Sequence, residues 1–71
     1  MKPLEIVVMD RLGTRRTLRF SSKASAIAYL KTTHATEAVI SFTYWDGSPL
    51  KQRVMNSIFE QVFEGLERAA A

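Results

Sequence analysis

The side chains that could do nucleophilic chemistry are one histidine and a few polar groups elsewhere: His34, Ser41, Ser48 and Asp46. Such catalysis needs a nucleophile beside a base that a third group holds in place. His34 falls in the expected connection after a helix, and no serine stands in a nucleophile-elbow sequence. We therefore interpret His34 as a surface loop residue and expect no covalent catalysis.

The sequence supports neither acid–base catalysis by paired carboxylates nor metal binding. Three acids, Glu60, Glu64 and Glu67, recur at the spacing of a solvated helix face. The three glycines lie far apart, whereas a phosphate loop needs them close together. There is no cysteine, and a single histidine cannot build a metal cluster. We expect no enzyme, no cofactor and no metal site.

The sequence instead offers a candidate docking surface on one face of a sheet. Tryptophan and arginine are enriched among the residues that dominate binding energy at protein interfaces. If the strands pair as their turns indicate, one face collects such residues together with apolar side chains. The predicted partner-binding residues are Val7, Met9, Arg15, Thr17, Arg19, Trp45, Lys51 and Arg53.

A hairpin positions the first part of this surface. Residues 4–9 and 14–20 are apolar or alternating, and Gly13 ends the stretch between them. A three-residue loop that closes on a left-handed glycine is a common hairpin turn. It pairs Asp10 with Thr14 and places the strongly apolar side chains on one face. The pairs expected on the other face are Glu5 with Arg19, Val7 with Thr17 and Met9 with Arg15.

Two helices are expected. Ser21 and Ser22 offer an N-cap for a helix over 23–33, whose apolar stripe is Ala26, Ile27 and Leu30. Ser57 and Glu60 match a capping box, which predicts a helix over 58–69. The apolar stripe of this second helix is Ile58, Phe59, Val62, Phe63 and Leu66.

A second strand pair is predicted around the turn signal Asp-Gly-Ser-Pro at 46–49. Residues 39–45 form one strand, with the even-numbered apolar residues toward the core and with Val39 and Trp45 on the opposite face. Residues 50–55 return as a fourth strand, which carries the two basic residues of the predicted surface.

The register of this second pair has two alternatives. Pairing Tyr44 with Leu50 turns Leu50 and Val54 inward. A two-residue turn would pair Tyr44 with Pro49 and reverse the faces. We favour the first register because it buries the apolar side chains, and we place the strand at an edge because proline cannot donate a hydrogen bond.

These elements predict a single α+β domain over residues 1–71, without a linker. The expected order is β-β-α-β-β-α, with an antiparallel sheet and both helices on one face. The chain has 71 residues, which supply only a thin stabilising core. Small domains are commonly stabilised by disulfides, metal ions or oligomerisation, and only oligomerisation remains possible for this sequence. We therefore consider a homodimer and a monomer equally.

Charge is distributed unevenly along the chain. The net charge is +3, with nine Lys and Arg against four Asp and Glu in residues 1–55. Residues 56–71 carry one Arg against three Glu. This asymmetry favours an anionic partner for the sheet, although a positive charge of this size also serves solubility. The sequence shows neither a membrane-spanning run nor a signal-peptide core, so we expect a cytoplasmic protein.

The function we expect is a non-enzymatic interaction module. It would dock on another protein as an inhibitor, an adaptor or an assembly subunit through the basic, tryptophan-containing sheet face. The alternative is a small nucleic-acid-binding protein that uses the same face, since sheet-face readers stack bases on aromatics and neutralise phosphates. On size class alone, the chain also fits the short antagonist proteins of phage and mobile-element genomes.

Overall fold

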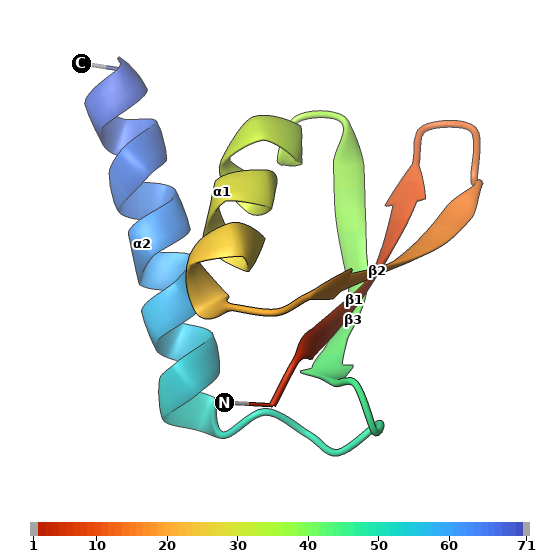
Figure 1. Cartoon of the computed structure of the whole chain (residues 1–71). Helices are drawn as coiled ribbons and strands as arrows, with labels where there is room; N and C mark the ends of the chain where they lie inside the picture. The colour runs from red at the N-terminus through yellow and green to blue at the C-terminus, as the bar shows by residue number, and fades with distance from the viewer. Residues whose placement is uncertain (1, 71) are drawn as a thin grey trace.

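The alternating segments of the sequence form an antiparallel sheet, on which two helices pack. The computed structural model describes residues 2–70, and the side chains of residues 2–64. The elements are β1 Leu4–Asp10, β2 Arg15–Phe20, α1 Lys23–Thr33, β3 Glu37–Tyr44 and α2 Gln52–Ala70 (Figure 1). The α+β class is confirmed, but the order is β-β-α-β-α.

The first hairpin has the predicted register. Leu4 pairs with Phe20, Val7 with Thr17 and Met9 with Arg15. Gly13 has φ +84°, and its N–H donates to the Asp10 carbonyl at 3.1 Å. The Asp10 carboxylate accepts from the backbone of the loop, from Leu12 N and Thr14 N. A left-handed glycine and a loop-capping aspartate therefore fix the turn, as their positions in the sequence indicate.

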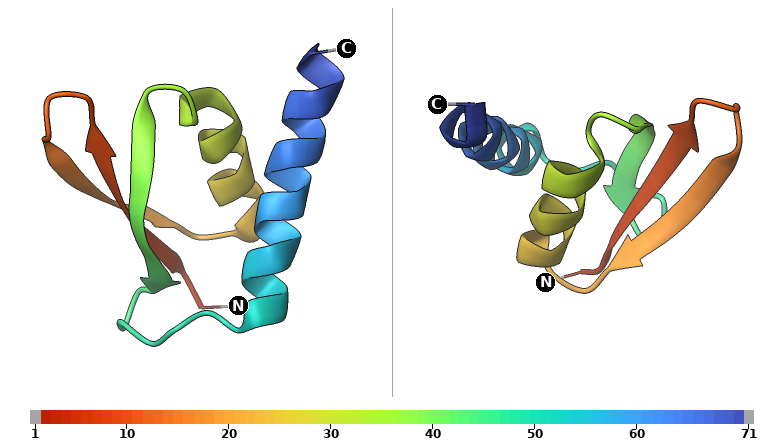
Figure 2. Two further views of the ribbon diagram at one scale, coloured as in Figure 1. Left: turned by 180° about the vertical axis from the view of Figure 1, so that it is seen from behind. Right: turned by 90° about the horizontal axis from the view of Figure 1, so that it is seen from above.

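β1 lies at the centre of the sheet, whose strand order is β2-β1-β3. β1 is antiparallel to both neighbours, so β2 and β3 run parallel to each other on either side of it. α1 forms the crossover between them, over one face of the sheet (Figure 2). The central place of β1 agrees with its composition, since Leu4, Ile6 and Val8 are at most 1 % exposed.

A β-bulge in β3 corrects the predicted faces of that strand. Val7 lies opposite Ser41, but Val8 lies opposite Val39, so Ile40 is the extra residue. Val39 therefore lies on the helix-facing side with Val8, not on the outer face as predicted. A bulge shifts the alternation by one residue, and the adjacent β-branched residues at 39 and 40 carry no signal of it in the sequence.

The predicted fourth strand over 50–55 is wrong, and so is its register with Tyr44. The chain turns through Trp45, Asp46 and Gly47, with Gly47 at φ +84°. Tyr44 pairs with Ser48 through a 2.9 Å backbone hydrogen bond, and Pro49 makes one isolated bridge to Thr43. Proline has no N–H to continue a ladder, so the hairpin stops there.

α2 instead begins at Gln52, six residues before the predicted start. Its apolar stripe extends backward at helical spacing to Val54 and Met55, which pack against the core. Ser57 is therefore inside the helix rather than at its N-cap. Its hydroxyl accepts hydrogen bonds from Lys23 at 3.0 Å and from Gln61 at 3.2 Å. The side chains of Leu66 and Glu67, on which other predictions fell, lie outside the described residues.

The core lies between the sheet and the helix layer, and both helices lie on one side of the sheet (Figure 2). The N-cap of α1 is Ser22, whose hydroxyl accepts from Ser25 N at 3.2 Å, as predicted. The predicted α1 stripe is buried. The buried core residues are Leu4, Ile6, Val8, Ala26, Ile27, Leu30, Phe42, Leu50, Ile58 and Val62.

Candidate docking face of the sheet

The side of the sheet opposite the helices carries six of the eight predicted partner-binding residues. Each of the three strands contributes three residues to this side, and the registers align them across the sheet. Trp45 follows β3 and extends this side at one end, where its N–H donates to the Pro3 carbonyl at 3.0 Å. We call this surface the outer sheet face; it comprises Glu5, Val7, Met9, Arg15, Thr17, Arg19, Ala38, Ser41, Thr43 and Trp45.

Among residues 2–70, no helix or strand covers this face (Figure 2). Val7 and Met9 are partly buried by their neighbours within the sheet, whereas Arg15, Thr17 and Arg19 are exposed. Trp45 is 49 % exposed. The face thus combines exposed arginines on β2, partly buried apolar residues on β1 and a half-exposed indole after β3, which is the mixed character of a protein interface.

The charge of the outer sheet face is smaller than the sequence suggested. Arg19 Nε lies 3.2 Å from Glu5 Oε1 in the cross-strand pair expected from the register. Within residues 2–64, Arg15 forms no ion pair. The face therefore carries two arginines and one glutamate, a net charge of +1.

Lys51 and Arg53 do not belong to this face. Their placement depended on the incorrect fourth strand. Lys51 accepts the first hydrogen bonds of α2, from Val54 N and Met55 N, and Arg53 lies in the first turn of that helix. Both side chains are exposed there. The two basic residues thus add their charge to the N-terminus of α2 instead of to the sheet.

Of the groups considered for catalysis, Ser48 and Asp46 meet in one turn, whereas His34 contacts a different part of the chain. His34 is exposed, and its Nδ1 contacts the Lys31 carbonyl at 3.0 Å. The Ser48 hydroxyl and backbone N–H donate to Asp46 at 2.6 and 3.0 Å, which lowers the pKa of Asp46 to about 2. Such an acid is a turn cap rather than a general base at neutral pH. No group of acids and histidines among the described residues could hold a metal ion.

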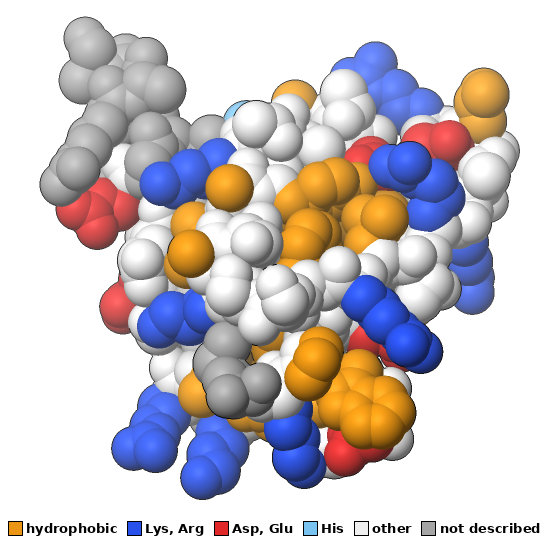
Figure 3. Space-filling model, in the orientation of Figure 1, with side chains coloured by type: hydrophobic (Ala, Val, Ile, Leu, Met, Phe, Trp, Pro, Cys, Tyr) orange, Lys and Arg blue, Asp and Glu red, His pale blue; other side chains and the backbone are white. Residues whose placement is uncertain are grey.

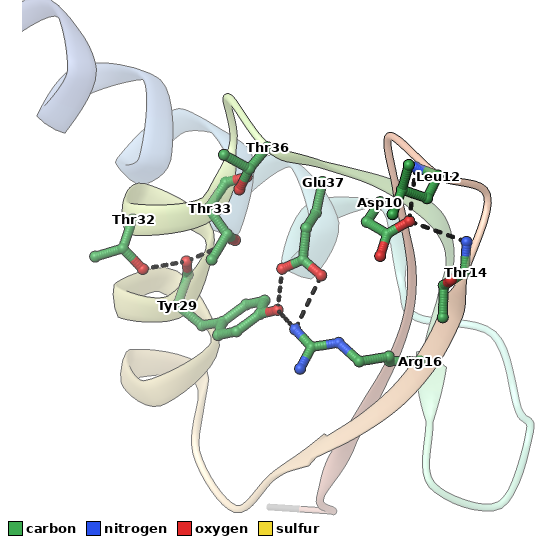
Figure 4. A network of polar contacts seen from close by, with 9 residues as sticks. All are labelled: Asp10, Leu12, Thr14, Arg16, Tyr29, Thr32, Thr33, Thr36 and Glu37. Carbon is green, nitrogen blue, oxygen red and sulfur yellow. Dashed lines mark hydrogen bonds and ion pairs between the residues drawn. The ribbon is translucent and has the colours of Figure 1, made fainter.

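A polar network that the sequence did not reveal lies on the helix side of the sheet (Figure 4). The Tyr29 hydroxyl of α1 donates to Glu37, and Arg16 donates to both of them, at 2.9 Å to Glu37 and 3.1 Å to Tyr29. The hydrogen bond from Tyr29, followed by that from Arg16, lowers the pKa of Glu37 below its ordinary value. Partial burial raises the pKa of Tyr29. The network joins β2, α1 and β3.

Apolar side chains also gather where α1 and the first hairpin diverge, with Lys and Arg side chains around them (Figure 3). Leu18 and Phe20 of β2 are only partly buried, and the Phe20 ring lies 5.4 Å from that of Tyr29. α1 therefore covers the β2 side of the sheet incompletely. The aromatic pair and the polar network are the contacts that hold the hairpin to α1.

Comparison with protein-family models, with curated proteins and with solved structures finds no significant match to this chain. Among the described residues, neither helix combines the length and the apolar character that a bilayer crossing requires.

Proposed function

We propose that this chain is a non-enzymatic interaction module that docks on another protein through the outer sheet face. The observation that carries the proposal is a sheet side that no described element covers, with Arg15 and Arg19 on β2, Val7 and Met9 on the central strand and a half-exposed Trp45 after β3. An inhibitor, adaptor or assembly role in the cytoplasm fits a module of this kind.

The chemistry of the face favours a partner that is apolar and weakly acidic. Val7 and Met9, on the central strand, offer apolar surface to a partner. The half-exposed indole of Trp45 can insert into a pocket of that partner. Arg15, which forms no ion pair within residues 2–64, supplies a guanidinium for a partner carboxylate. Arg19 can exchange its surface pair with Glu5 for a similar one, because exposed pairs contribute little stability.

Nucleic acid is the competing partner, and the corrected fold weakens its case. Two of the four cations expected on the face, Lys51 and Arg53, lie at α2 instead. The Glu5 carboxylate on the same face opposes phosphate binding, and Trp45 is the single aromatic residue on it. A stacking surface for single strands combines a strongly basic groove with several aromatics.

Affinity capture with charge-matched variants tests the proposal. The bait is the immobilised chain, compared with Arg15→Glu/Arg19→Glu and with Lys51→Glu/Arg53→Glu, which makes the same charge change away from the sheet. We expect a host protein that wild type and the Lys51/Arg53 variant retain and that the Arg15/Arg19 variant loses. Trp45→Ala should also lose it while circular dichroism shows an unchanged fold.

Nuclease treatment and salt separate the two classes of partner. A protein partner should survive nuclease, and its affinity should fall less than about tenfold between 50 and 200 mM salt. Binding through 6–10 phosphates would instead fall by roughly 10³–10⁵ over that range. Equal loss of the partner in both charge-matched variants would show that the outer sheet face is not the docking site.

A further inference from the structure

The backbone hydrogen bonding of the sheet stops at β2. Among the described residues, β2 has one neighbouring strand, β1 (Figure 2). The N–H of Asp10 donates to the Thr14 carbonyl across the hairpin, so the even-numbered residues of β2 turn their backbone groups toward β1. Arg15, Thr17 and Arg19 turn theirs outward. We call the backbone N–H and C=O groups of these three residues the β2 edge.

The other edge strand, β3, offers no such uninterrupted row. The N–H of Tyr44 donates to the Ser48 carbonyl at 2.9 Å, and Thr43 forms a bridge to Pro49. Further along β3, the bulge at Ile40 breaks the alternation of the backbone groups. The β2 edge is therefore the better place for a further strand to join the sheet.

Apolar surface lies beside the β2 edge on the helix-facing side of the sheet. Leu18 and Phe20 are only partly buried there, and apolar side chains gather where α1 and the hairpin diverge (Figure 3). A strand placed beside β2 would turn every second side chain toward this side, next to Leu18 and Phe20. Apolar side chains at those positions would extend the core of the domain past β2.

On the outer side, the same strand would meet the side chains of Arg15, Thr17 and Arg19, which are exposed. Arg19 already pairs with Glu5 at 3.2 Å. Arg15 forms no ion pair within residues 2–64. An acidic side chain opposite Arg15 would therefore gain a new charge-assisted contact, whereas a neutral side chain suffices opposite Arg19.

We infer that the β2 edge accepts an extended strand of a partner protein, antiparallel to β2, with apolar side chains toward α1 and an acidic side chain opposite Arg15. An extended polypeptide is the chemistry that matches a row of outward N–H and C=O groups, because its own backbone completes their hydrogen bonds. The inference deepens the proposed function and rests on it, since the added strand widens the outer sheet face.

A second copy of this chain fits the β2 edge poorly. Antiparallel pairing of two β2 strands about Thr17 would place Arg15 of each copy opposite Arg19 of the other. Like charges directly opposite each other destabilise a strand pair. The β3 strand of a second copy is interrupted by its bulge and bridged at one end. The arginines thus act against self-pairing at this edge and favour an acidic strand.

Titration of the isotope-labelled full chain with a designed peptide, followed by NMR, tests the inference. The peptide has seven residues and capped ends: valine at the odd positions, then glutamine, threonine and glutamate at the even positions, so that glutamate meets Arg15. We expect saturable shifts of the Arg15, Thr17 and Arg19 amides, with the amides of β3 unchanged. A peptide with lysine in place of glutamate should bind about fivefold more weakly. The variant Arg15→Glu should reverse this preference.

Methylated peptides test whether the backbone makes the contact. Alternate N–H groups of a strand point to opposite edges, and in an antiparallel pair the threonine and glutamate of the peptide face β2. Methylation of these two nitrogens should weaken binding about tenfold or more, because two hydrogen bonds are lost. Methylation of the two preceding valine nitrogens is the matched control and should leave binding unchanged. Equal effects of the two methylations would overturn the inference.

The chain offers a matched pair of variants for the same question. Thr17→Pro removes an outward N–H and keeps the hydrogen bonds to β1, whereas Thr17→Ala keeps the N–H. Thr17→Pro should lose the peptide and Thr17→Ala should retain it, with circular dichroism checking that both are folded. A wild type whose β2 amides do not shift with the peptide would also overturn the inference, whatever the proline variant does.

The outcomes separate this inference from the proposed function. If affinity capture finds a protein that needs Arg15 and Arg19 while the peptide leaves the β2 amides unchanged, the docking face stands and strand addition is wrong. If the peptide binds as expected while Arg15→Glu/Arg19→Glu retains every captured protein, the β2 edge accepts a strand and the proposed docking through the outer sheet face is wrong.

Discussion

Arg16 Nη2 lies 2.9 Å from Glu37 Oε2, although β1 separates the strands that carry the two residues. The arginine side chain crosses the helix-facing side of β1 above Val8, its partner in the register. Tyr29 of α1 completes the contact from the helix (Figure 4). The exposed Arg16 of edge strand β2 thus pairs with the largely buried carboxylate of Glu37 on the other edge strand, β3. Through Tyr29, the same contact joins the sheet to α1.

Removing the hydroxyl from this network should destabilise the fold measurably. Tyr29→Phe takes away one of the two donors to Glu37 and keeps the ring contact with Phe20. The expected cost is about 0.5–1.5 kcal/mol in the free energy of unfolding, measured by urea denaturation. Tyr44→Phe is the matched control, because the Tyr44 hydroxyl makes no hydrogen bond within the described residues. An equal cost in both variants would contradict the role of the network.

Stability should depend on pH through Glu37. Its pKa is lower in the folded state than in the unfolded chain, so the unfolded chain binds more protons as the pH falls. The stabilisation from Glu37 is fully present above the pKa that a glutamate has in the unfolded chain, about 4.3. It is lost as the pH falls through the lower pKa that Glu37 has in the folded protein. The urea midpoint should therefore stay level from pH 7 to about 5.5 and decline below that.

The variant Glu37→Gln isolates this contribution. Its difference in urea midpoint from wild type should shrink as the pH falls from about 5 toward 3, because wild-type Glu37 becomes neutral as well. Asp46, with its pKa lowered to about 2, acts in the same direction and extends the decline in both proteins to lower pH. A difference between the two proteins that is constant across this range would argue against the assignment.

The two loop glycines should tolerate asparagine better than alanine. Gly13 and Gly47 both have φ +84°, and nothing lies within 4 Å of the position that a Cβ would occupy. The cost of Gly13→Ala or Gly47→Ala is therefore backbone strain alone, about 1–2 kcal/mol in the free energy of unfolding. Gly13→Asn should cost less, because asparagine enters the left-handed region more readily. Equal costs for alanine and asparagine would count against these turn conformations.

A capping substitution at Lys51 tests where α2 begins. Lys51 is the residue whose carbonyl accepts the first helical hydrogen bonds, and its side chain cannot accept a bond from the exposed N–H groups. Lys51→Ser should be more stable than Lys51→Ala by about 1 kcal/mol in thermal or urea unfolding. If residues 50–55 were a strand, the serine hydroxyl would find no helix to cap, and the two variants would have the same stability.

The parts of the fold that were predicted correctly depend on neighbours in the sequence. The first hairpin follows from Asp10, Gly13 and the alternation around them, and α1 follows from Ser22 and its stripe. Six of the predicted residues share the outer sheet face because the register of that hairpin, and the pairing of β3 just before Trp45, carry them. Local turn and cap chemistry was enough in these segments, because each signal acts within a few residues.

The second half of the chain contained conflicting local signals. Leu50 and Val54 suit an inward-facing strand, and Val54, Ile58 and Val62 equally suit a helix. The Ser57–Glu60 pair resembled a helix start, but in the folded chain Ser57 serves as an acceptor for Lys23 of α1. The apolar period alone did not choose between strand and helix over so short a segment.

The amino-acid sequence by itself determined the first hairpin and the first helix, because turns, caps and alternation are short-range properties. Tertiary structure alone decided that residues 52–57 join α2, that a bulge turns Val39 inward, and that Arg16 meets Glu37 across β1. These outcomes depend on which distant surfaces are available to be buried or paired. That availability arises only when the chain has folded.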